Sequence, residues 1–80
     1  MSRLRQYYDK FLVEYYNGDR SASVHAGSMY YRVYFYINGE LVGDRMFFEQ
    51  PRELAEKYAK EWILEKFNED QINQLHKAIS

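Results

Sequence analysis

The clearest hydrophobic pattern of the chain lies in its middle, where residues 29–37 are mostly aromatic or β-branched. Such a run is typical of a β-strand. Residues 40–48 form a second run rich in strand-forming residues, and Asn38 and Gly39 between the two readily take the positive φ of a tight turn. The pattern therefore predicts a β-hairpin over residues 29–48.

The register of this hairpin decides which side chains share a face of the sheet. A two-residue turn would place Arg32 opposite Arg45, and such a pair of like charges is unfavourable. A turn with Gly39 as a bulge instead places Arg32 opposite Asp44. We therefore predict the bulged register, in which the inward side chains are Met29, Val33, Phe35, Leu41 and Phe47.

From residue 51 onward, apolar residues recur at the spacing of an amphipathic helix. Pro51 suits the first position of this helix, and Asn68 can end it and cap a second, short helix over residues 69–78. Charge pairs such as Glu53 with Lys57 predict a solvated outer side. The apolar stripe, which makes one broad side of the predicted helix, consists of Leu54, Ala55, Tyr58, Ala59, Trp62, Ile63 and Phe67.

The N-terminal third allows two interpretations. Spacings such as Leu4, Tyr8 and Phe11 match a helix over residues 2–16, whereas residues 10–16 before Asn17 and Gly18 are typical of a strand, which we favour. Residues 19–28 are small and polar, so they predict either a weak edge strand or a loop. The predicted fold is one α+β domain over residues 1–80: an antiparallel sheet of three strands, or four if 19–28 pairs, followed by two C-terminal helices.

Composition narrows the function classes. The chain has 80 residues, no cysteine and a net charge of −1, so it can form one core, no disulfide and no cysteine-based zinc site. It lacks a secretory signal pattern and any run of about 18 apolar residues. We therefore expect a cytoplasmic protein that does not enter a membrane. The unusual feature is an aromatic share of 19%, with nine tyrosines.

The residues that could carry chemistry form no recognisable catalytic or metal-binding motif. His25 and His76 are far apart in sequence and belong to no zinc-binding spacing. The serines near His25 lack the context of an activated nucleophile. Gly39 and Gly43 belong to the hairpin and do not form a phosphate-binding loop. We expect no catalytic residue, no metal and no cofactor, and hence a protein that is not an enzyme.

The alternating tyrosines of residues 30–36 are the main candidate site. If this segment is extended, Tyr30, Arg32, Tyr34 and Tyr36 share one face of the sheet. The helices could cover this face as core, or the face could bind a protein, since tyrosine and arginine are enriched at interface hot spots. It could also stack on single-stranded RNA or DNA, with Arg32 and Arg45 at the phosphates. Pairing of two copies as a homodimer is a further option.

A resemblance adds a possible target. The tract from Ile37 to Phe47, followed by a helix that opens at residues 50–54, resembles small phage anti-CRISPR proteins that bind the type I-F surveillance complex. In that family a tyrosine two residues before an earlier Asn-Gly turn contacts the backbone-forming Cas subunit and helps to block target DNA, and Tyr15 stands at this place here. The family's contact glutamate falls at Tyr34, so that acidic contact is lost.

Together these features predict a non-enzymatic, protein-binding inhibitor. We expect it to block a host defence complex or a toxin by steric occlusion, and the resemblance implies that it is phage-encoded and that the defence complex is of the CRISPR type. The alternative is a binder of single-stranded RNA or DNA that uses the same face. The candidate partner-binding residues are Tyr15, Tyr30, Arg32, Tyr34 and Tyr36.

Overall fold

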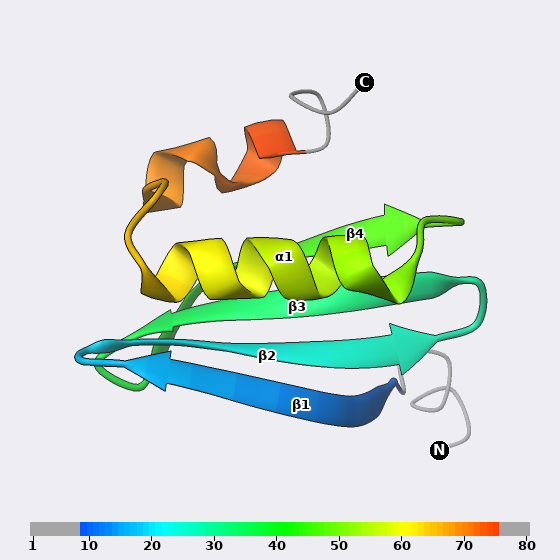
Figure 1. The fold of residues 1–80 in the computed structure, drawn as a ribbon, viewed down its shortest axis with the longest axis horizontal. Helices are drawn as coiled ribbons and strands as arrows, with labels where there is room; N and C mark the ends of the chain where they lie inside the picture. Colours follow the sequence, from blue (N-terminus) through cyan, green and yellow to red (C-terminus); the bar gives the residue numbers. More distant parts are fainter. Residues whose placement is uncertain (1–8, 76–80) are drawn as a thin grey trace, which may run out of the picture.

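The computed structural model describes residues 9–75, which form a four-stranded antiparallel sheet with helices on one face (Figure 1). The strands are β1 (Lys10–Asn17), β2 (Arg20–Gly27), β3 (Tyr30–Ile37) and β4 (Glu40–Phe48). They follow one another in the order β1-β2-β3-β4, and each pairs with the next. The helix α1 (Arg52–Ile63) and the 3₁₀ helix η2 (Glu69–Gln74) follow the sheet. The α+β fold class is therefore confirmed, and the sheet has the larger of the two predicted strand numbers.

The core lies between the sheet and its helical layer. The helix α1 packs on β2 and β3, and η2 packs on β4 (Figure 1). Trp62 and Phe35 meet at the centre with their rings 5.2 Å apart. The helix α1 is amphipathic, and its predicted apolar stripe faces the sheet. The buried apolar residues are Ala22, Val24, Val33, Phe35, Phe47, Ala55, Tyr58, Ala59, Trp62, Phe67, Ile72 and Leu75.

The predicted hairpin register was wrong along its length. The turn is a two-residue turn with Asn38 and Gly39 at φ 53° and 83°, which matches the type I′ geometry. An irregularity then lies in β4 between Leu41 and Gly43, because Tyr36 pairs with Leu41 whereas Phe35 pairs with Gly43. This extra residue displaces Arg45 from Arg32, so the strand avoids the like-charge pair by a bulge inside β4 instead of a bulge at the turn.

The register corrects two of the five predicted inward residues. Val33, Phe35 and Phe47 are fully buried, as predicted, but Met29 and Leu41 are 69% and 55% exposed. Leu41 precedes the irregularity and therefore lies on the face opposite Phe47. Met29 belongs to the turn between β2 and β3, where it has a φ of 66°.

The described part of the N-terminal third forms two strands that are joined by a turn at Gly18 and Asp19. The preference for a strand over residues 10–16 is confirmed by β1. Residues 19–28 were predicted as a weak edge strand or a loop, and 20–27 of them form β2, which is an inner strand. The small residues Ala22 and Val24 are fully buried in the core, where α1 packs on β2. The close approach of α1 to β2 thus favours small side chains in β2. Because these side chains are small, the sequence of this segment does not show the strong hydrophobic pattern of an inner strand.

The C-terminal part differs from two regular helices. The helix α1 ends at Ile63, and Phe67 is buried from the connection that follows. The second helix is the 3₁₀ helix η2, with Asn68 as its N-cap, and residues 76–78 of the predicted helix lie outside the described part. Arg20 of β2 holds this region to the sheet, because its guanidinium donates hydrogen bonds to the carbonyl oxygens of Trp62 (3.2 Å) and Phe67 (2.9 Å).

Candidate functional site

The sheet face that points away from α1 is the candidate site, and we call it the open face. In a strand, alternate side chains point to opposite faces, and directly paired residues of neighbouring strands share a face. Tyr30, Tyr34 and Tyr36 therefore lie on the same face as their β4 partners Phe48, Asp44 and Leu41. The open face comprises Phe11, Glu14, Tyr16, Ser21, Ser23, His25, Tyr30, Arg32, Tyr34, Tyr36, Leu41, Asp44, Met46 and Phe48.

Four of the five predicted site residues come together there. Tyr30, Arg32, Tyr34 and Tyr36 all lie on the open face and are partly exposed. Tyr15 does not join them, because it is paired with the buried Ala22 and packs against the core on the other face. Its ring lies 5.5 Å from the Lys60 ammonium group of α1. A partner that contacts Tyr15 would therefore approach a different side of the molecule from one on the open face.

Sequence reasoning missed the apolar margins of the open face. Phe11 and Tyr16 of β1 are 54% and 69% exposed, and Leu41 and Phe48 of β4 are 55% and 57% exposed. The two edge strands thus carry large, solvent-accessible apolar side chains on both sides of the tyrosines. Contiguous exposed apolar surface is typical of an interaction site. These residues do not alternate regularly in the sequence, because β1 and β4 each contain an irregularity, so only the observed register reveals that they share a face.

A network of polar side chains occupies the middle of the open face. The Asp9 carboxylate, whose side chain is only 7% exposed, lies 3.7 Å from both Arg32 and His25. The Tyr30 hydroxyl donates to Asp9 at 3.4 Å. On the other side, Arg32 Nε lies 3.4 Å from the Asp44 carboxylate. The guanidinium of Arg32 therefore sits between two carboxylates, which offset its positive charge.

The same network fixes the orientation of Tyr34. Arg32 donates a hydrogen bond of 3.0 Å to the Tyr34 hydroxyl, and this bond is the main reason that the pKa of Arg32 is raised. The His25 ring meets the Tyr34 ring edge to face, with centroids 4.8 Å apart. Tyr34 is thus held from both ends. A side chain that is already ordered loses less conformational entropy when a partner binds.

Ser23, His25 and Asp9 have the composition of a catalytic triad but lack its other requirements. Ser23 Oγ lies 2.9 Å from His25 Nε2, and His25 Nδ1 lies 3.7 Å from Asp9. However, Ser23 is only 4% exposed, so a substrate carbonyl could not reach its hydroxyl without rearrangement. The flanking backbone of β2 is paired on both sides by β1 and β3, which leaves no free N–H groups for an oxyanion hole. We therefore assign these side chains to positioning the face.

His25 makes the stability of this face depend on pH. Burial lowers the pKa of His25 below its ordinary value of 6.5, although the nearby Asp9 opposes this effect. The unfolded chain then binds the proton more tightly than the folded chain, so we expect the free energy of unfolding to fall as the pH drops below about 6.5. Urea titrations at several pH values between about 5.5 and 7.5 measure this slope.

The His25→Gln variant isolates the effect, and it should flatten the decrease. An equally steep decrease in this variant would show that groups other than His25 cause it.

Two further properties concern the described residues. Within residues 9–75, no group of three or more His, Asp or Glu side chains is arranged to hold a metal ion. Of the two histidines considered as ligands, His76 lies outside the described residues. Neither helix of this part of the chain is long and apolar enough to cross a membrane.

Comparison with known proteins gives no relative from which a function could be transferred. The chain matches no protein-family model, no curated protein and no solved structure. The open face is therefore the feature from which a function has to be inferred.

Proposed function

We propose that this chain is a non-enzymatic protein-binding inhibitor that covers part of its target with the open face and acts by steric occlusion. The observation that carries the proposal is the combination of a partly exposed tyrosine row in β3 with exposed apolar residues in both edge strands. Neither α1 nor η2 covers this face, because both pack on the other side of the sheet.

The residue types on the open face, and the contacts that fix their side chains, support a protein partner. Tyrosine and arginine are enriched among interface hot spots, where a rigid aromatic body supplies contact area and a polar tip supplies specificity. Tyr34 is held by Arg32 and His25, so its contribution to binding would not be offset by a large loss of rotamer freedom. The exposed margins, such as Tyr16 and Phe48, would add apolar area around this ordered centre.

The electrostatics of the open face favour a protein over a nucleic acid. Arg32 is held between Asp9 and Asp44, and Glu14 is exposed on the same face. Arg45, the second cation considered for phosphate binding, is paired with the buried Val33 and so lies on the opposite face from Arg32. A phosphate backbone would thus meet carboxylates with little compensating positive charge.

The class of target follows only from the sequence resemblance. It implies a phage-encoded inhibitor of a host defence complex of the CRISPR type in the host cytoplasm. The tyrosine that the resemblance singles out, Tyr15, lies away from the open face. We therefore base the proposed mechanism on the open face and keep the identity of the target as a prediction of the resemblance.

Substitution of the exposed margins tests the proposal. Tyr16→Ala combined with Phe48→Ala removes two side chains that are more than half exposed and lie at opposite edges of the face. We expect about a tenfold weaker affinity for the partner, equivalent to about 1.4 kcal/mol, with little effect on folding. The measurement is affinity capture from extracts of the native host, followed by titration of the captured protein.

The matched control is Leu64→Ala, because Leu64 is 57% exposed but lies beyond the C-terminus of α1. This variant should capture the same protein as the original chain. Equal capture by the Tyr16/Phe48 double variant would contradict the proposal. Recovery of single-stranded nucleic acid in a strongly salt-dependent manner would favour the alternative function.

A further inference from the structure

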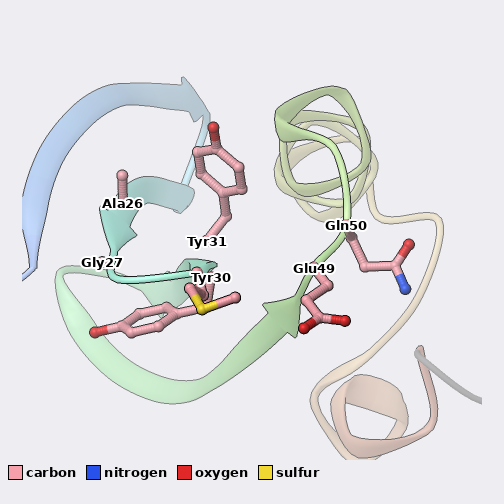
Figure 2. Close-up of a pocket in the computed structure, with 7 residues that line it drawn as sticks. Ala26, Gly27, Tyr30, Tyr31, Glu49 and Gln50 are labelled. Carbon is pink, nitrogen blue, oxygen red and sulfur yellow. The ribbon is translucent and has the colours of Figure 1, made fainter.

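A pocket lies at one end of the sheet, between the turn that joins β2 to β3 and the segment that joins β4 to α1. Its volume is about 250 Å³. Figure 2 shows Tyr30 and Tyr31 on the turn side of the pocket and Glu49 and Gln50 on the other side. Drug-sized ligands occupy cavities of about 300–1,000 Å³, so this pocket suits a smaller group such as one side chain.

Both walls of the pocket have unusual backbone geometry. Met29 and Glu49 line it, and they have φ values of 66° and 56°, in a region that residues other than glycine rarely occupy. The backbone N–H of Glu49 donates to the Met29 carbonyl at 3.1 Å, which ties the two walls together. Strained residues persist where surrounding structure holds them, and they concentrate at sites that bind ligands.

The chemistry of the pocket combines an apolar wall with one carboxylate. Ala26, Met29 and the two tyrosines supply apolar and aromatic surface. Glu49 is exposed and forms no ion pair within the described chain, whereas the nearby Arg52 is paired with Glu56 at 2.7 Å. A side chain with an aliphatic stem and a cationic end complements this arrangement, since its stem can lie along apolar surface while its charge reaches a carboxylate or an aromatic ring.

We propose that the pocket receives a lysine or arginine side chain of the protein partner, with the cation at Glu49 and the stem against Met29 and Tyr31. This inference rests on the proposed function and specifies the chemistry of the partner. The pocket borders the open face, because Tyr30 contributes to both and its ring packs against Phe48 at 5.6 Å. A partner on the open face would therefore need a basic residue where its surface passes the end of β3.

Small probes test the pocket without the partner. We expect N-acetyl-lysine methylamide to shift the backbone amide signals of Gly27, Tyr31, Glu49 and Gln50 in ¹⁵N–¹H spectra. N-acetyl-norleucine methylamide has a similar stem without the amine and should bind about threefold more weakly, as expected for one exposed charge pair. Glu49→Gln should weaken binding of the lysine probe about threefold and leave the norleucine probe unchanged.

Glu53→Gln is the matched control, because it removes the same charge from the first turn of α1 and not from the pocket. It should leave both probes unchanged. Equal affinity of the two probes, no effect of Glu49→Gln, or no shift at the pocket amides would each overturn the inference. These failures would leave the dependence of partner capture on Tyr16 and Phe48 intact, so they are distinguishable from a failure of the proposed function.

Discussion

Trp62→Ala is expected to lower the free energy of unfolding by about 3–5 kcal/mol, the usual cost of removing a large aromatic side chain from a core. Trp62 is fully buried where α1 packs on the sheet. Its ring contacts Phe35 and Phe67, and its indole N–H donates to the Tyr36 carbonyl at 3.2 Å. The substitution would therefore create a cavity and leave a backbone carbonyl without its partner.

The Trp62→Ala substitution would also destabilise the contacts of Arg20, because the Trp62 ring helps to orient the Arg20 guanidinium. The Arg20 guanidinium lies 4.0 Å from the centre of the Trp62 ring while it donates to the carbonyl oxygens of Trp62, in the last turn of α1, and of Phe67, in the connection that follows. Without the ring, Arg20 loses the cation–π contact that helps to orient it. The connection that holds α1 and η2 to β2 would weaken together with the core.

Urea denaturation followed by far-UV circular dichroism measures the effect. A small domain has a total stability near the lower end of about 5–15 kcal/mol, so Trp62→Ala could be largely unfolded. Trp62→Phe keeps part of the ring volume and should fall between the original chain and Trp62→Ala. Leu64→Ala is the exposed control and should change stability by less than about 0.5 kcal/mol. A loss below about 1 kcal/mol for Trp62→Ala would contradict the described core.

The elements that could be predicted from the sequence are those with a strong local pattern. The run 29–37 is rich in strand-forming residues, Asn38 and Gly39 suit a tight turn, and the stripe from Leu54 to Trp62 has the spacing of a helix. These became β3, the hairpin turn and α1. The alternation of β3 also placed Tyr30, Arg32, Tyr34 and Tyr36 on one face of the sheet, as predicted.

The features that could not be predicted depend on contacts between distant segments. The irregularity at Val42 resolves the charge conflict between Arg32 and Arg45, but a bulge at the turn would have resolved it equally well. The inner position of β2 depends on the close approach of α1 to Ala22 and Val24. Arg20 reaches the end of α1 across more than forty residues of sequence. No local period encodes any of these contacts.

The open face is left uncovered by α1 and η2 because both of them pack on the other face of the sheet. The helical layer uses the apolar residues on one side of the sheet, and the chain stabilises the other side with polar contacts such as those of Asp9 and Arg32. That arrangement keeps tyrosines ordered without burying them in the core. A second sheet face that is ordered, aromatic and uncovered by α1 or η2 is the physical basis of the proposed binding function.

Gly27→Ala is expected to displace the Tyr30 ring and to destabilise the fold by about 1 kcal/mol, the order of the aromatic and hydrogen-bond contacts that the ring would lose. A Cβ atom at Gly27 would lie 2.0 Å from Cζ of the Tyr30 ring, which is far inside van der Waals contact. The backbone at Gly27 does not have a positive φ, so the cost would come from this ring. Tyr30 would have to move away, and it would lose its contacts with Asp9 and Phe48.

A double-mutant cycle separates this explanation from a general intolerance of β2 to substitution. In a Tyr30→Ala background the obstruction is gone, so Gly27→Ala should become neutral or stabilising by about 0.5 kcal/mol, because alanine loses less backbone entropy than glycine on folding. Urea titrations of the four chains give this coupling directly. Destabilisation of similar size in both backgrounds would show that Tyr30 does not pack over Gly27.

The same cycle would also connect stability with binding. If the Tyr30 ring is displaced in Gly27→Ala, the open face and the pocket both change shape, because Tyr30 belongs to each. Partner capture and lysine-probe binding should then weaken together in Gly27→Ala, although no side chain of the face has been removed. Normal capture and normal probe binding by a folded Gly27→Ala variant would mean that the orientation of Tyr30 does not matter for either surface.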